Sequence, residues 1–149
     1  MSALPSDRQE ALLALHDRLA GSGVRYQLGG SAMLALRGIP VDIHDLDLVF
    51  PVSARDLVAV ALADWWEGFT TIDHPIFSSD WYARVKVDDV PVDLVGGFKI
   101  KGEEPLPFRD DEAVRVAGTE IPLAPVDVWI RIYQKYDRAK AELLAQLLR

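Results

Sequence analysis

Three short groups of residues in this chain have the chemistry of a phosphate and metal site. The turn Gly29-Gly30-Ser31 combines glycines, which allow close backbone approach, with a hydroxyl. Asp45-Leu46-Asp47 places two carboxylates one residue apart, and Asp93 lies alone between apolar residues further on. Carboxylate oxygens are the hard ligands that Mg²⁺ prefers, and Mg²⁺ in turn binds phosphates. Together the three groups predict a metal-dependent site for nucleotide phosphates.

The aspartate pair is expected to point to one face of a β-strand. Side chains alternate along a strand, so Asp45 and Asp47 emerge on the same side, with Cα atoms about 6 to 7 Å apart. Leu46 then points to the other side, into the core. Two such carboxylates can share one or two Mg²⁺ ions, and Asp93 from a neighbouring strand would complete the arrangement. Taken alone, the pair is also compatible with solvent-facing aspartates at the start of a strand.

The glycine turn is expected to join a short strand over 24–28 to a short helix over 32–37. Ser31 is a candidate N-cap for this helix, and Gly38 would help to end it. The N–H groups at the start of the helix and its positive dipole end would then face a triphosphate. A plain turn closed by a capping serine is the alternative for this motif on its own.

The spacing of these groups resembles the signature of the nucleotidyltransferase superfamily, which has the DNA polymerase beta-like fold. Members carry a Gly-Gly or Gly-Ser pair, a short spacer, Asp-x-Asp between apolar residues, and a later lone acidic residue. Here 13 residues (32–44) separate Gly30-Ser31 from Asp45-Leu46-Asp47-Leu48, and Val92-Asp93-Leu94 follows. The resemblance covers residues 24–95 well. Within it, the stretch 28–49 is especially similar to small bacterial members: minimal nucleotidyltransferases, AbiE-type toxin catalytic domains, and lincosamide and aminoglycoside nucleotidyltransferases.

The resemblance implies a role for each matching position. Gly29, Gly30 and Ser31 would contact the nucleotide phosphates. The carboxylates of Asp45 and Asp47 would hold Mg²⁺ (or Mn²⁺). Asp93 would complete one metal site and help to deprotonate or orient the acceptor hydroxyl. The implied activity is the transfer of a nucleoside monophosphate from an NTP to a hydroxyl on a protein, an RNA or a small molecule.

Arg84 is weighed as a further phosphate ligand. A two-residue turn at Asp88-Asp89 would join strands over 81–87 and 90–95, and this register pairs Arg84 with Asp93. Arg84 then either forms a structural ion pair with that carboxylate, which is the favoured interpretation, or offers its guanidinium to a phosphate or acceptor. The alternation sends the apolar side chains to the core: Val85, Val87, Val90, Val92 and Leu94.

Lys135 is the second basic candidate. The chain is expected to end in a long helix over 125–148, in which Lys135 shares a stripe with Arg131 and Arg138. A solvated helix face explains this stripe most simply. In AbiE-like relatives, however, a lysine on a C-terminal helix approaches the nucleotide, and the resemblance nominates Lys135 for that position.

The remaining patterns predict an α/β (α+β) fold, a mixed β-sheet flanked by helices and closed by the long C-terminal helix. Leucines at helical spacing indicate a first helix over 7–20. Further expected elements are strands over 46–52 and 69–72, a helix over 54–64 capped by Ser53, a loop over 99–108, and a small hairpin of 114–117 and 121–123 around Gly118. Residues 1–149 are expected to form a single domain.

Composition narrows the functional classes. The formal net charge of −7 makes the chain alone a poor ligand for nucleic acid, because such proteins usually carry a basic surface. Half of the residues are hydrophobic and 26% are charged, as in ordinary globular proteins. The absence of a membrane-length apolar run, of a signal peptide and of cysteine predicts a cytoplasmic protein without disulfides or thiolate chemistry.

Three functions fit these patterns. The first is a nucleotidyltransferase in a toxin-antitoxin setting, with a small helical protein partner or a second copy of the chain. The second is a catalytically silent binding module of the same fold, such as an antitoxin. The third is an aminoglycoside or lincosamide nucleotidyltransferase. The acceptor, the preferred base and the oligomeric state do not follow from the sequence.

Overall fold

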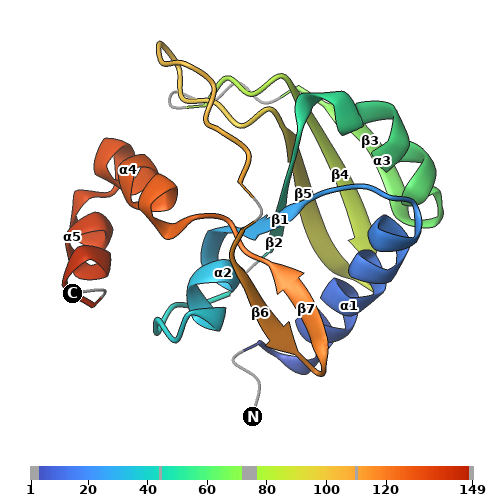
Figure 1. Ribbon diagram of the computed structural model, residues 1–149, viewed down its shortest axis with the longest axis horizontal. Helices are drawn as coiled ribbons and strands as arrows, with labels where there is room; N and C mark the ends of the chain where they lie inside the picture. The colour runs from blue at the N-terminus through green and yellow to red at the C-terminus, as the bar shows by residue number, and fades with distance from the viewer. Residues whose placement is uncertain (1–3, 44, 72–76, 110, 148–149) are drawn as a thin grey trace.

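The computed structural model describes residues 4–43, 45–71, 77–109 and 111–147. Among them, helices and strands alternate along the first part of the chain and a hairpin and two helices follow (Figure 1). The helices are α1 (Ser6–Gly21), α2 (Gly30–Leu36), α3 (Arg55–Ala61), α4 (Val126–Tyr136) and α5 (Arg138–Leu147). The strands are β1 (Gln27–Gly29), β2 (Leu46–Phe50), β3 (Trp66–Thr70), β4 (Trp81–Val87), β5 (Val90–Gly96), β6 (Ala113–Val116) and β7 (Thr119–Pro122).

The strands of the main sheet lie in the order β1-β2-β5-β4-β3, and β6 and β7 form a separate hairpin. The pairing of β2 with β5 is parallel, whereas the other neighbours are antiparallel. The predicted mixed sheet flanked by helices is therefore confirmed. None of the helices in the described ranges combines the length and the apolar run that a bilayer crossing requires.

The hairpin of β4 and β5 has the predicted register. Asp88 and Asp89 form its two-residue turn with φ values of 46° and 70°, the left-handed pair that such turns need. Val87 faces Val90, and all five apolar side chains assigned to the core are buried. The alternation of this hairpin therefore separates a fully apolar face from a face that carries charge.

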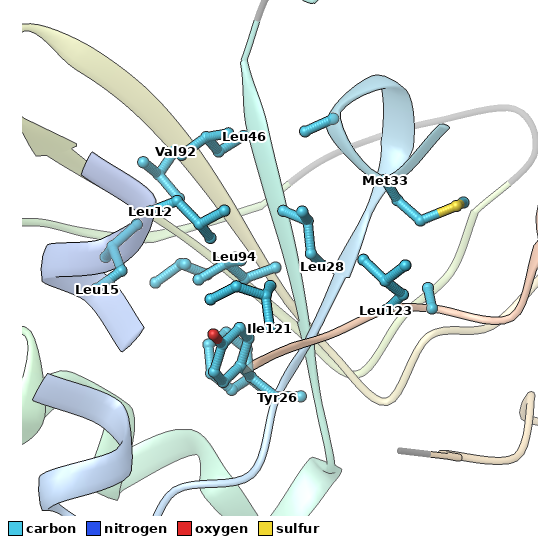
Figure 2. Packing of buried hydrophobic residues seen from close by; sticks show 14 of the residues in the cluster. Leu12, Leu15, Tyr26, Leu28, Met33, Leu46, Val92, Leu94, Ile121 and Leu123 are labelled. Atoms are coloured by element: carbon cyan, nitrogen blue, oxygen red, sulfur yellow. The ribbon is translucent and has the colours of Figure 1, made fainter. Parts of the chain in front are cut away.

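The hydrophobic core lies between the apolar face of the sheet and α1 (Figure 2). Leu12 and Leu15 of α1 are completely buried and lie near Val92 and Leu94 of β5 in this cluster. Helix α3 contacts α1 on the same side (Figure 1). Helices α4 and α5 lie away from this layer (Figure 1).

The prediction of one long C-terminal helix is wrong, because the helix is interrupted at Asp137. This residue has extended dihedrals (φ −150°, ψ 79°) and separates α4 from α5. Its Oδ1 atom accepts a hydrogen bond from the backbone N–H of Lys140, at 3.2 Å. An aspartate that accepts this bond caps the start of a helix, so α5 is a separate helix that does not continue the axis of α4.

Three smaller boundaries also differ from the sequence predictions. The helix expected from residue 54 begins at Arg55, after a short 3-10 turn over Val52–Ala54, and Ser53 makes no side-chain cap bond. The strand expected over 69–72 lies at β3, three residues earlier, and residue 72 lies outside the described residues. The first strand is shorter than expected, and pairing begins only at Gln27.

The β4–β5 turn offers a test of this register. Replacing Asp88-Asp89 by Asn-Gly should raise the free energy of unfolding by about 0.5 to 1 kcal/mol, because Asn and Gly adopt left-handed φ values more readily. Urea denaturation followed by circular dichroism would measure the change. The control is Asp111→Asn, which removes a charge from an exposed residue outside any strand. Destabilisation by the Asn-Gly turn would contradict the described turn geometry.

Candidate active site

A row of residues crosses the polar face of the sheet at one level. Gly29 of β1 pairs with Asp47 of β2, Asp47 is level with Asp93 of β5, and Asp93 pairs with Arg84 of β4. Residues at one register level on neighbouring strands point to the same face. Two of the three predicted metal carboxylates are therefore adjacent, although β2 and β5 are far apart in the sequence.

The third carboxylate, Asp45, lies just before β2 and also acts on Asp47. Burial of the Asp47 carboxyl raises its pKa from 3.8 to about 7, and repulsion from Asp93 and then from Asp45 adds to this rise. A carboxylate that responds to both neighbours must lie close to them. That the three carboxylates form one metal site stays a prediction, with Asp93 level with Asp47 and Asp45 near enough to raise its pKa.

Gly30 is required by the position of Asp47. It begins α2 with a φ of +61°, a conformation that favours glycine. A Cβ atom at Gly30 would also overlap the Oδ2 atom of Asp47. Ser31 does not cap the helix as predicted, because α2 already begins at Gly30 and Gly29 occupies the cap position without a side-chain bond. The Ser31 hydroxyl is therefore not committed to capping.

Arg84 forms the predicted ion pair with Asp93. Its Nε and Nη2 atoms both lie 3.0 Å from Oδ1 of that carboxylate. The hydrogen bond to Asp93 and its charge raise the pKa of Arg84 above its ordinary value. The guanidinium is half exposed, so it holds one oxygen of Asp93 in place from the solvent side and leaves Oδ2 outside this contact.

An open cleft of about 450 Å³ lies over the glycine turn and the aspartate pair. Gly30, Ser31, Asp45 and Asp47 line it from the sheet side. The rest of its lining comes from Val41, Asp42, Trp129, Tyr133 and Lys140. Asp93 neighbours Asp47 but does not itself line the cleft. The cleft therefore joins the early motifs of the sequence to the two C-terminal helices.

The lysine in this cleft is Lys140, whereas the sequence nominated Lys135. Lys135 lies on the exposed side of α4 and its Nζ is 3.1 Å from Oε2 of Glu103, a carboxylate that Arg131 also contacts. Lys140 lies in the first turn of α5, with its Nζ 4.5 Å from the centre of the Tyr133 ring. The signal in the sequence was Asp137, whose capping role turns the helix and brings Lys140 to the cleft.

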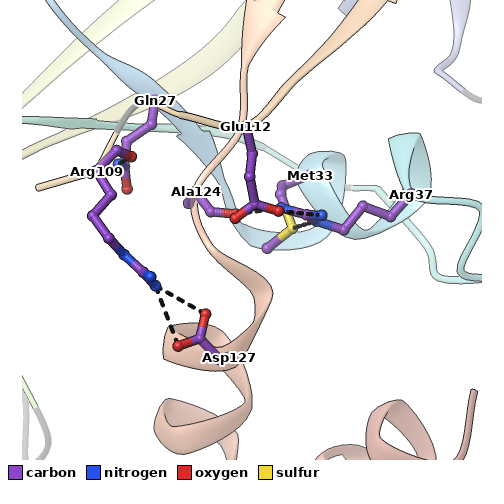
Figure 3. Close-up of polar contacts among 7 residues, drawn as sticks. All are labelled: Gln27, Met33, Arg37, Arg109, Glu112, Ala124 and Asp127. Atoms are coloured by element: carbon purple, nitrogen blue, oxygen red, sulfur yellow. Dashed lines mark hydrogen bonds and ion pairs between the residues drawn. The ribbon is translucent and has the colours of Figure 1, made fainter. Parts of the chain in front are cut away.

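Two arginine contacts hold the start of α4 beside the cleft (Figure 3). Arg37 of α2 donates to the carbonyl oxygen of Ala124 at 2.9 Å and pairs with Glu112 at 3.0 Å. Arg109 contacts the carboxylate of Asp127, in the first turn of α4, at 3.0 Å. These contacts tie α4 to α2 and to the loop before β6, and so fix the helix that carries Trp129 and Tyr133.

Trp129 packs directly on the glycine turn. A Cβ atom at Gly29 would lie 2.5 Å from its Cζ2 atom, so only glycine allows this contact. Its indole lies edge-on to Phe98, with ring centres 5.4 Å apart, and 6.1 Å from the Tyr133 ring. The two glycines of the turn therefore have separate roles: Gly29 leaves room for the indole of Trp129, and Gly30 leaves room for the carboxylate of Asp47.

The donor set suits a hard divalent cation. Burial raises the pKa of the half-buried Asp47 to about 7, and the charges of Asp93 and Asp45 add to this rise. Among the described residues, no group of three or more His, Cys, Asp or Glu side chains is arranged so that it could hold a metal ion. In proteins, Mg²⁺ is typically held by one or two carboxylates together with substrate phosphates and water. Asp45 and Asp47, with Asp93 beside them, are the residues that fit such an ion.

Solved structures of nucleotidyltransferases have the same architecture. TM1012 of Thermotoga maritima, provisionally named a nucleotidyltransferase, has a TM-score of 0.78 at 22% identity, over 97% of this chain and 94% of that one. ANT(2″)-Ia in complex with adenylyl-2″-tobramycin has a TM-score of 0.58 at 15% identity, over 89% and 79%. The lincosamide antibiotic adenylyltransferase LnuA, with bound lincomycin, has a TM-score of 0.58 at 17% identity, over 86% and 87%.

No family profile matches the chain, and neither does any curated protein. The structural matches cover most of both chains in each comparison, but their sequence identities are low. They therefore establish the architecture without fixing a substrate. The order of the elements, the mixed sheet and the agreement with these structures show that this chain shares the fold of these solved nucleotidyltransferases.

Proposed function

We propose that this chain transfers a nucleoside monophosphate from an NTP to a hydroxyl acceptor with Mg²⁺ (or Mn²⁺) as cofactor. The observation that carries the proposal is the half-buried Asp47, held between the glycine turn and two further carboxylates. Holding a half-buried carboxylate beside two others is costly unless a cation offsets the charge. A purely structural role for Asp47 would not need such neighbours.

Each residue of the site has a role in the proposed reaction. Asp45 and Asp47 hold the cation, which would neutralise charge on the triphosphate. Gly30 and Ser31 line the cleft where the phosphates bind, and Lys140 supplies a positive charge there. The acceptor oxygen forms a bond to the α-phosphorus as the bond to the bridging oxygen breaks, and pyrophosphate leaves. Asp93, fixed through Oδ1 by Arg84, orients the acceptor hydroxyl and takes its proton.

The acceptor defines the competing functions. A second candidate is modification of an antibiotic, since ANT(2″)-Ia and LnuA share the fold and are solved with an adenylylated aminoglycoside and with a lincosamide. For the transferase proposed above, we propose a toxin-antitoxin setting in the cytoplasm. Its partner would be a small helical protein or a second copy of the chain. A catalytically silent module is less favoured, because the carboxylates and the glycine turn are all present.

Nucleotide binding should stabilise the chain. Mg²⁺ with an NTP at 100 times its dissociation constant adds about 2.7 kcal/mol to the free energy of unfolding and should raise the melting temperature by about 5 °C or more. Asp45→Asn should abolish this rise, because it removes a ligand of the cation. Differential scanning fluorimetry with each of the four NTPs, with and without Mg²⁺, measures both effects.

The control for this measurement is Glu10→Gln, which removes one charge from an exposed residue of α1. It should keep the full nucleotide effect. A melting curve that no NTP changes would refute nucleotide binding. Transfer of label from α-labelled NTP to lincomycin or tobramycin would favour the antibiotic acceptor, whereas binding without any release of pyrophosphate would favour the silent module.

The raised pKa of Asp47 predicts how stability depends on pH. Between pH 4 and pH 7 the folded chain holds a proton on Asp47 that the unfolded chain has released, so this contribution to stability is lost as pH rises towards 7. Asp47→Asn stays neutral at every pH. Its stability advantage over the original chain should therefore grow by roughly 2 to 3 kcal/mol between pH 5 and pH 7 and level off above about pH 8.

Urea denaturation at pH 5, 6, 7 and 8 in the presence of EDTA would test this, since EDTA removes cations that bind the ionised form. Glu10→Gln reports the effect of an exposed carboxylate and should show no such trend. A constant difference between Asp47→Asn and the original chain across this range would mean that the Asp47 carboxyl titrates normally.

A further inference from the structure

A second, apolar cavity of about 200 Å³ lies beside the cleft. Gln27 of β1 and Val49 of β2, which face each other across these strands, form part of its lining. The proline-rich loop over 105–108 lines it from another side. Helix α4 contributes Val128 and Trp129. The apolar cavity is therefore enclosed by the sheet, a loop and a helix, and is not a shallow surface groove.

The apolar cavity and the cleft are adjacent. Trp129 lines both of them, and its indole is fixed against Gly29. Val49 follows Asp47 by two residues on the same strand face, so their Cα atoms lie about 6 to 7 Å apart. A ligand that fills the apolar cavity and extends past the indole would thus bring its outer end to the carboxylates.

The lining of the apolar cavity selects for uncharged groups. The side chains around it are apolar apart from Gln27 and the indole nitrogen of Trp129, and none of them is charged. Gln27 is only 5% exposed. Its Nε2 donates to the carbonyl oxygen of Arg109, the one side-chain hydrogen bond that Gln27 makes to the described residues (Figure 3).

The Oε1 atom of the Gln27 amide accepts no hydrogen bond from the part of the chain that the structure describes. No buried side-chain nitrogen or oxygen among the described residues lacks a partner. Because Oε1 has no hydrogen-bond partner within 4–43, 45–71, 77–109 or 111–147, it borders open space, and Gln27 lines the apolar cavity. A donor group on a ligand could bind Oε1 there, whereas a charged group would lose its hydration without compensation.

We propose that the apolar cavity binds an uncharged planar ring that carries an N–H or O–H donor, and that this ring belongs to the acceptor. The volume is suitable, since an apolar cavity of about 150 Å³ is enough for benzene. The cleft is itself large enough for a nucleotide, which leaves the apolar cavity for the second substrate. The assignment to the acceptor rests on the proposed function, whereas ring binding does not.

Ring binding can be measured without nucleotide or cation, with indole as the probe and saturation-transfer NMR as the readout. We expect indole to bind with a dissociation constant on the order of 1 mM, as is usual for a small ring. Val128→Phe, which fills the apolar cavity, should weaken binding at least tenfold. Gln134→Phe adds the same ring at an exposed position of α4 and should leave the dissociation constant for indole unchanged.

The role of Gln27 is tested by comparing the binding of two rings, indole and toluene, to a Gln27 variant. Gln27→Met should weaken indole binding at least threefold and leave toluene binding unchanged, because toluene has no donor for Oε1. Benzamidine, a cation of similar shape, should not bind. Melting curves confirm that each variant is folded. Equal binding of indole to the original chain and to Val128→Phe, or equal binding of benzamidine and indole, would overturn the proposal.

A nucleobase is also a planar ring with a donor, so competition with Mg²⁺–ATP separates the two sources. If the apolar cavity serves the acceptor, indole stays bound at saturating Mg²⁺–ATP, and Val128→Phe keeps the nucleotide-induced rise in melting temperature. Displacement of indole by Mg²⁺–ATP would overturn the acceptor assignment and indicate that the apolar cavity binds the nucleobase of the NTP. Asp45→Asn should still bind indole, so loss of nucleotide binding and loss of ring binding are distinguishable.

Discussion

The parallel pairing of β2 with β5 is the constraint on which the site depends. This register makes Asp47 and Asp93 neighbours on one face, and on the other face it aligns Leu46 with Val92 and Leu48 with Leu94. Those four apolar side chains are completely buried. The hydrophobic free energy of one face therefore offsets the repulsion between carboxylates on the other. A shift of one residue would exchange the two faces and lose both.

Much of the sheet could be predicted from the sequence because its information is local. The β4–β5 hairpin follows from alternation and a two-residue turn, which together fix the pairing of Arg84 with Asp93. The face of the sheet on which Asp47 lies follows from the alternation of side chains along a strand. The choice of β5 as the parallel partner of β2 is different, since it depends on packing between segments distant in the sequence and leaves no local signal.

The C-terminal side of the site could not be predicted for a different reason. The apolar stripe of α4 continues in register into α5, so periodicity indicates one helix and conceals the break. A single residue, Asp137, changes the direction of the chain through its dihedrals and its capping bond. Lys140 therefore reaches the cleft, whereas Lys135 pairs with Glu103.

The lining of the cleft and of the apolar cavity divides the chain into an early and a late part. Carboxylates and the glycine turn come from α2, β2 and β5, where sequence changes disturb the core as well. Helix α4 is attached through Trp129 and the contacts of Arg37 and Arg109, and the loop over 105–108 through the backbone hydrogen bond of Leu106 to Phe98. In evolutionary terms, descendants of this chain could exchange the late part, and with it the preferred acceptor, while inheriting the chemistry of the early part intact.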